Sequence, residues 1–329
     1  MEGDRIEVLA EEARGIAARS GDLRSLALLK QLESARPGLD VTTAEWTAAA
    51  EEAISLADES GDDALRMALR TVGSYSYMCA ADFDNVERLV DEALELAGDD
   101  QGAGAGIVVG CPYAWCLMAK GMVRLERGEF DAADEFFGLA LKIANDHGDP
   151  ETEGWTRGSQ AMLLVMRGEL DAALRLAVRN YEITEQLGDV FSRHWALFYL
   201  GYVYGARAEF GHALDYLERA ERLYREAMGR GGEAEPWRDA ALADALRGVD
   251  RVPEALERAD RGVAAGRERG LNWSLPRALR IAAVVRAAAG RPGGPELLDE
   301  AEVIASATRQ TVELEAIREA RDAMAASPG

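Results

Sequence analysis

One short segment returns along the chain at a nearly fixed spacing. It reads Arg-Gly-Glu-Phe-Asp-Ala-Ala at 127–133, and related versions follow at 167–173, 207–213 and 249–255. Self-similarity at a period of roughly 20–50 residues is typical of repeat proteins, whose units bury their apolar faces only against neighbouring units. The chain is therefore expected to stack as a solenoid rather than fold around one central core.

A second turn signal falls between the copies of the first. A glycine, in most copies followed by aspartate, stands at 21, 61, 148, 188 and 270. Glycine suits the left-handed conformation that ends a helix, and aspartate can cap the helix that follows. Two turns per period indicate two helices per repeat, and the segments between turns carry apolar residues at helical spacing, as in 170–177. The expected fold class is all-α, an α-solenoid of helix pairs with a period of about 40 residues.

Small residues recur inside the repeats. Gly201 and Ala213 are twelve residues apart, and the same separation holds for the pairs 121/133, 161/173 and 243/255. Small side chains at these places would let the two helices of a repeat approach closely. The best copy of the whole pattern consists of Leu200, Gly201, Tyr204, Ala213, Leu217 and Ala220. This spacing resembles the tetratricopeptide signature, and the resemblance implies a right-handed solenoid of tetratricopeptide-like helix pairs.

The turn signals predict one solenoid over residues 1–329. A capping helix is expected near 5–19 and a closing helix near 311–326, because the end repeats need covers for their apolar faces. Seven helix pairs are expected between them, at about 22–60, 62–99, 107–147, 149–187, 189–229, 236–269 and 271–309.

Two segments carry a closer resemblance. They are the glycine-rich run 102–110 with Cys-Pro-Tyr-Ala-Trp at 111–115, and Gly-Asp-Pro-Glu-Thr-Glu-Gly-Trp at 148–155. They look like the C-terminal repeat region of bacterial adenylate or guanylate cyclases that also carry an AAA-type ATPase module. They are also similar to the repeat arm of maltose-regulator-like transcription activators. The first resemblance implies a non-catalytic sensor or scaffold in a bacterial signalling protein. The second implies an inducer-binding arm, and a free-standing adaptor is the third interpretation.

Composition and motifs argue against several other functions. A net charge of −22 opposes binding to nucleic acid. No apolar run reaches the roughly 18–20 residues that would span a membrane, and the N-terminus does not read as a signal peptide, so a cytoplasmic location is expected. The glycine-rich stretch 98–110 lacks the lysine and hydroxyl residue of a phosphate loop and is expected to be an inter-repeat loop. The three cysteines and three histidines have no catalytic or metal-site spacing, so no enzyme activity, cofactor or metal is expected.

Four of the six tryptophans occupy one repeat position. Trp115, Trp155, Trp195 and Trp237 each lie six residues before a small residue of the first helix, and we refer to them as the tryptophan series. By resemblance to tetratricopeptide solenoids this position faces the concave side. The expected groove is completed by Tyr75, Met118, Met122, Arg157, Met162, Arg193, Phe198 and Tyr202.

Such a face would suit a protein or peptide partner, or a small-molecule effector. Large aromatic residues are also typical of inter-repeat core. Both interpretations stay open here, as does a mixed one in which one ring face packs and one edge lines the groove.

Overall fold

The computed structural model describes residues 2–34, 41–228 and 232–326. Residues 1, 35–40, 229–231 and 327–329 of the predicted solenoid lie outside the described residues. The described residues form sixteen α-helices and no strand, with one isolated bridge between Ala105 and Val108. The helices are α1 (Glu2–Ser20), α2 (Leu23–Ser34), α3 (Thr43–Ser60), α4 (Asp63–Ala80), α5 (Phe83–Ala97), α6 (Pro112–Glu126), α7 (Phe130–Asp146), α8 (Pro150–Met166), α9 (Leu170–Leu187), α10 (Val190–Ala206), α11 (Phe210–Met228), α12 (Glu235–Gly248), α13 (Val252–Arg269), α14 (Leu275–Ala288), α15 (Gly294–Ala307) and α16 (Thr311–Ala326).

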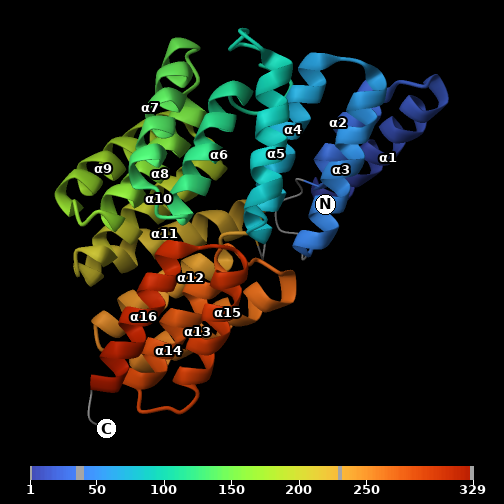
Figure 1. Ribbon diagram of the computed structural model, residues 1–329. Helices are drawn as coiled ribbons and strands as arrows, with labels where there is room; N and C mark the ends of the chain where they lie inside the picture. The colour runs from blue at the N-terminus through green and yellow to red at the C-terminus, as the bar shows by residue number, and fades with distance from the viewer. Residues whose placement is uncertain (1, 35–40, 229–231, 327–329) are drawn as a thin grey trace.

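The helices pack in consecutive pairs. From α2 and α3 to α14 and α15, each expected repeat segment holds two helices in extensive mutual contact. The even-numbered helices α4 to α16 also contact one another in series, and they form one layer of the stack (Figure 1). This arrangement is the all-α solenoid that the repeat period predicts. None of the helices in the described ranges is long and apolar enough to span a bilayer.

The turns have the geometry that their residues predict. The side chains of Asp62, Asp149 and Asp189 accept hydrogen bonds from the backbone three residues later and so cap α4, α8 and α10. The first helix of a repeat is followed by a left-handed residue, which is Gly128 in one repeat (φ 77°) but Ala208 in another (φ 58°). Since alanine disfavours this conformation, the packing of the repeat imposes it.

Small residues bring the two helices of a repeat together. A side-chain carbon added at Gly121 would lie 2.6 Å from the Phe137 ring and 3.2 Å from the carbonyl oxygen of Ala133. At Gly201 the added carbon would lie 2.7 Å from Leu217. These positions therefore tolerate nothing larger than glycine without a shift of the partner helix, which confirms the role predicted for the twelve-residue pairs.

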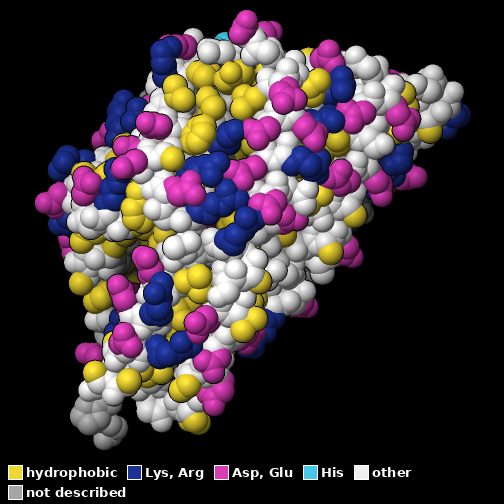
Figure 2. Space-filling model, in the orientation of Figure 1, with side chains coloured by type: hydrophobic (Ala, Val, Ile, Leu, Met, Phe, Trp, Pro, Cys, Tyr) yellow, Lys and Arg dark blue, Asp and Glu magenta, His cyan; other side chains and the backbone are white. Residues whose placement is uncertain are grey.

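The solenoid curves so far that its last repeats contact its first ones. The Thr43 hydroxyl donates a hydrogen bond to the carbonyl oxygen of Gly270 (3.1 Å). The backbone N–H of Trp273 donates to the carbonyl oxygen of Cys79 (3.2 Å). Arg309 forms an ion pair with Asp84. In Figure 1 the orange and red helices return toward the lower ends of α4–α6, and α16 contacts α6. The space-filling view shows acidic and basic side chains mixed over this face, with Lys and Arg gathered across its middle (Figure 2). The concave side is thus closed over rather than open along its length.

Candidate binding pocket

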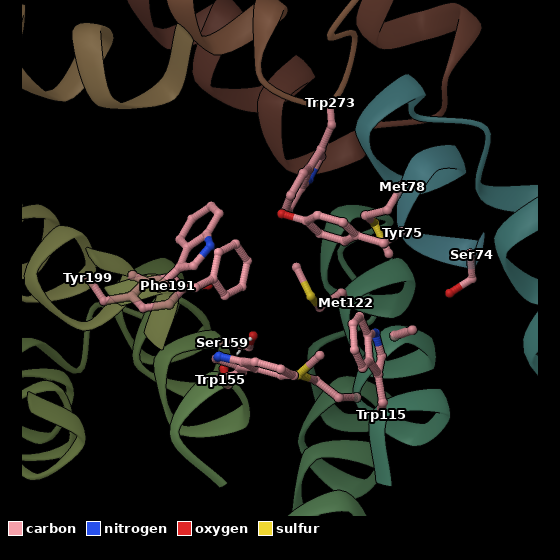
Figure 3. Close-up of a pocket in the computed structure, with 13 residues that line it drawn as sticks. Ser74, Tyr75, Met78, Trp115, Met122, Trp155, Ser159, Phe191, Tyr199 and Trp273 are labelled. Carbon is pink, nitrogen blue, oxygen red and sulfur yellow. Dashed lines mark hydrogen bonds between the residues drawn. The ribbon is translucent and has the colours of Figure 1, made fainter. Parts of the chain in front are cut away.

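A hollow lined by aromatic and methionine side chains lies inside this curve, and we call it the aromatic pocket. Its volume is about 620 Å³ when the open solvent at its mouth is included. Four even-numbered helices, α4, α6, α8 and α10, supply most of its wall, and the turn before α14 supplies the rest (Figure 3). The lining residues are Ser74, Tyr75, Met78, Trp115, Met118, Ala119, Met122, Trp155, Ser159, Phe191, Trp195, Tyr199 and Trp273.

Aromatic rings form a continuous edge-to-face chain along this wall. Trp115 and Trp155 have ring centroids 5.1 Å apart, and Phe191 connects Trp155 (5.9 Å) to Trp195 (6.4 Å). Trp195 contacts Trp237 at 6.2 Å. Such T-shaped pairs stabilise a fold beyond the burial of their surface. The rings therefore hold one another in place and form a preorganised apolar surface.

The tryptophan series shares one position relative to the turns. Trp115 precedes the left-handed Gly128 by the same number of positions as Trp155 precedes the left-handed Gly168. Tyr75 lies 40 residues before Trp115, so the repeat period would give it the same position. It lies much closer to its own left-handed residue, Ala81, and corresponds to Met122 instead. The period was misleading here because the loop between α5 and α6 lengthens that repeat. Tyr75 nevertheless lines the pocket with Met122.

The tryptophans differ in how far they are buried. Trp115 and Trp155 are half-buried, each with ring contacts on one side and the pocket on the other. Trp195 is 5% exposed and lines the pocket, whereas Trp237 is 1% exposed and lies outside this lining. Trp115, Trp155 and Trp195 thus combine ring packing with a place in the pocket lining, and Trp237 is part of the buried core.

The remaining groove candidates divide between pocket and core. Met118 and Met122 line the aromatic pocket. Met162 and Phe198 are buried at 1% and 0% exposure and do not line it. Tyr202 lies with Trp237 beside a second pocket, at the level of α12 and α14.

The two arginines predicted for the groove lie elsewhere. Arg157 donates to Glu153 (2.9 Å) and Arg193 donates to Glu185 (2.8 Å), and neither lines the aromatic pocket. Each is two residues from its tryptophan, and residues two apart on a helix point to different sides. A position two residues from a tryptophan therefore does not bring either arginine into the pocket.

Three polar groups at the pocket are already hydrogen-bonded within the protein. The indole N–H of Trp155 donates to Ser192 (3.0 Å), and that of Trp273 donates to the buried carboxylate of Glu126 (2.7 Å). The Tyr75 hydroxyl donates to Glu233 (3.3 Å), and burial raises the pKa of Tyr75 well above its ordinary value. The pocket therefore offers a bound molecule mainly apolar and aromatic faces.

Three aromatic lining residues escaped the prediction. Phe191 lies four residues before Trp195, one helical turn away, so helical spacing could have found it. Tyr199 fits because residue 158 is glycine, where an added side-chain carbon would lie 2.2 Å from its ring. Trp273 reaches the pocket only because the solenoid closes, and no local pattern signals that.

The other sequence candidates have structural roles. The glycine-rich loop packs between repeats: Gly104 approaches the carbonyl oxygen of Ala64, and the N–H of Cys111 donates to Asp149 (2.5 Å). All three cysteines are buried free thiols, and burial raises the pKa of Cys116 to about 12. His194 is buried against Tyr224 with ring centroids 4.7 Å apart, and burial lowers its pKa to about 3. A neutral core imidazole is the consequence.

Comparison with known proteins identifies the fold but no family. No family model matches the chain, and no curated protein matches it. A Rap protein complexed with competence and sporulation factor is 14% identical, over 98% of this chain and 94% of that one, with a TM-score of 0.63. The Cut9–Hcn1 hetero-tetramer of APC/C is 14% identical, over 96% of this chain and 59% of that one, with a TM-score of 0.51.

A third similar structure is a signal transduction ATPase with numerous domains and a tetratricopeptide repeat sensor, from Pyrococcus horikoshii. It is 14% identical, over 91% of this chain and 50% of that one, with a TM-score of 0.49. At these identities the likeness concerns the fold alone. The chain is an all-α solenoid of tetratricopeptide-like repeats.

Proposed function

We propose that the chain is a non-catalytic tetratricopeptide-type sensor or scaffold that binds an apolar group of its effector in the aromatic pocket. The observation that carries this proposal is the preorganised wall of tryptophan, phenylalanine, tyrosine and methionine side chains inside the closed curve. Concave, mainly apolar pockets with few polar groups are typical ligand sites. The Rap structure with competence and sporulation factor shows that a solenoid of this fold can carry a bound factor.

The closure of the solenoid bears on the kind of ligand. An open groove would accommodate a whole amphipathic helix, whereas this pocket has about 620 Å³ at most. One large apolar side chain of a protein or peptide, or a compact small molecule, fits that space. The enclosed shape is the reason to keep the inducer-binding arm of a transcription activator as the second candidate. The preferred context is a bacterial cyclase and ATPase signalling protein in the cytoplasm.

The pocket is tested with a neutral apolar dye. N-phenyl-1-naphthylamine is titrated into the full chain while energy transfer from tryptophan is followed. Trp155→Ala removes one wall, and we expect binding to weaken about tenfold, which corresponds to ~1.4 kcal/mol. Tyr204→Ala is the matched control, because that ring stacks on Tyr216 (5.4 Å) away from the pocket, and it should leave binding unchanged.

A second variant separates binding from folding. Ala119 is 4% exposed and lines the pocket, so Ala119→Leu fills the space without removing an aromatic contact. Circular dichroism melting curves show whether each variant is folded. Dye binding that survives both Trp155→Ala and Ala119→Leu in folded protein would contradict the proposal.

A further inference from the structure

The concave face changes character in the seventh repeat. Arg277 stands before the left-handed Gly290 at the place that Trp237 occupies before the left-handed Asp250. Arg280, three residues later, takes the place of Phe198 in its repeat. The two repeat positions that carry Trp195 and Phe198 in α10 therefore carry guanidinium groups in α14.

These groups line a second hollow, which we call the arginine pocket. It is bordered by Tyr202, Trp237, Ala241, Asp244, Arg277 and Arg280, and its volume is about 650 Å³ with the open solvent at its mouth. It shares no lining residue with the aromatic pocket. Trp237 and Trp273 form an edge-to-face pair, with ring centroids 5.3 Å apart, and each lines one of the two hollows. The arginine pocket is therefore separate from the site of the proposed function.

Arg277 is buried against its neighbours, but not all of its hydrogen-bond donors have a partner among the described residues. Its side chain is 6% exposed, and its guanidinium lies 4.7 Å from the centre of the Trp237 ring. Its Nε is 3.2 Å from the Glu313 carboxylate, whereas its buried Nη1 has no hydrogen-bond partner within the described part of the chain. A buried donor without a partner costs about 1–3 kcal/mol, and more where it is charged. A ligand oxygen at this nitrogen would remove that cost.

The residues that line the pocket carry one excess positive charge, because Arg277 and Arg280 outnumber the single lining carboxylate, that of Asp244. Arg280 donates to both oxygens of Glu313, so one carboxylate serves two guanidinium groups. Asp244 is engaged by Arg247 (2.7 Å). Burial opposes the charge of Arg277, but Glu313, Tyr202 and Glu126 raise its pKa above the ordinary arginine value, and it stays a cation.

We propose that the arginine pocket binds a carboxylate attached to an apolar group, such as an organic acid or a peptide C-terminus. Arginine suits a planar carboxylate, and the Trp237 and Tyr202 rings with Ala241 provide an apolar surface beside it. A monoanion balances the one excess positive charge of the lining residues. A phosphate dianion would be repelled more strongly than a monoanion by the buried Glu313 and by the net charge of −22.

The probe is 3-phenylpropanoate, titrated into the full chain by calorimetry at pH 7.5. Its neutral amide and inorganic phosphate are titrated in parallel. We expect the acid to bind at least about tenfold more tightly than either. Equal binding of acid and amide, tighter binding of phosphate, or no detectable binding of the acid up to its solubility limit would each overturn the proposal. Peptides ending in phenylalanine, with a free or an amidated C-terminus, distinguish the peptide source from the organic acid.

Variants locate the binding. Arg280→Gln keeps Glu313 paired with Arg277, so it should fold and should weaken binding of the acid about tenfold. Ala241→Leu fills the hollow without changing charge and should weaken it as well. Arg267→Gln, at an exposed pair with Glu300, is the matched control and should have no effect. Trp155→Ala changes only the aromatic pocket and should also leave acid binding unchanged. The proposal for the aromatic pocket and the proposal for the arginine pocket can therefore fail independently. Unchanged acid binding in folded Arg280→Gln and Ala241→Leu would refute the assignment.

Discussion

Replacement of Trp273 by phenylalanine tests whether the contact that closes the solenoid contributes to stability. The indole N–H of Trp273 is the hydrogen-bond donor to Glu126, which is 1% exposed and whose second carboxylate oxygen already lacks a partner in the described part of the chain. A hydrogen bond to a charged group contributes about 1.5–3 kcal/mol. The smaller ring loses about 1 kcal/mol more of apolar burial. We expect Trp273→Phe to lower the apparent free energy of unfolding in urea by about 2.5–4 kcal/mol in total.

The stability lost in Trp273→Phe should also depend on pH. Burial raises the pKa of Glu126 above 4.5, while Arg277 and the Trp273 N–H lower it, so loss of the N–H raises it further. A carboxyl group whose pKa is raised by folding contributes stability at low pH that is lost as pH rises through the folded value. The cost of Trp273→Phe should therefore be larger at pH 8 than at pH 5.

A double-mutant cycle isolates the contact. In a Glu126→Leu background, Trp273→Phe should cost only about 1 kcal/mol, because no buried carboxylate is left unpaired. Trp155→Phe is the comparison with a neutral acceptor, Ser192, and should lose about 1 kcal/mol for its hydrogen bond, independent of pH. If the cost of Trp273→Phe is the same in both backgrounds, or the same at pH 5 and pH 8, the reasoning about Glu126 is refuted.

Further predictions concern helix glycines and a buried histidine. Gly158→Ala should lower the melting temperature and weaken dye binding, since the added carbon would lie 2.2 Å from the Tyr199 ring. Gly138→Ala, in a helix with open space around it, should instead stabilise the chain by about 0.5–1 kcal/mol, and equal melting of the two variants would count against this view of the packing. Burial lowers the pKa of His194 from 6.5 to about 3, so the unfolded chain alone takes up a proton below pH 6.5. Stability should fall by about 1.4 kcal/mol per pH unit as the pH drops from 6.5 toward 4. Urea titrations of His194→Leu should lack that contribution, and an unaltered pH profile would show that His194 is not its source.

The local features of the fold could be predicted because each has a local cause. Turn glycines, aspartate caps and small residues between paired helices depend on a few neighbouring residues. Gly121, Gly201 and the caps at Asp62 and Asp149 are in the places that spacing predicts. The repeat period therefore predicts the order of the helices and the layer in which each lies.

The candidate site could be predicted only in part, because its far wall depends on curvature. A small rotation per repeat accumulates along a solenoid, and its sum decides whether distant repeats meet. Met118, Met122 and the half-buried tryptophans follow from helical spacing, whereas Trp273 meets them across the curve. The partner of Arg157 is Glu153, one turn away on its own helix, and helical spacing alone could have predicted that pair.

The closure of the solenoid also explains why one repeat position holds a tryptophan in several repeats and an arginine in another. Along α6, α8 and α10 the position holds a tryptophan that packs on its neighbour and faces the aromatic pocket. At α14 the same position comes back toward α6, where the buried Glu126 lies within electrostatic reach of Arg277. An uncompensated buried carboxylate there would be costly, and a cation that meets it across the closed curve offsets that cost. The guanidinium is thus favoured by the contact that closes the solenoid. Its Nη1, which has no hydrogen-bond partner among the described residues, is left beside the hollow between α10, α12 and α14.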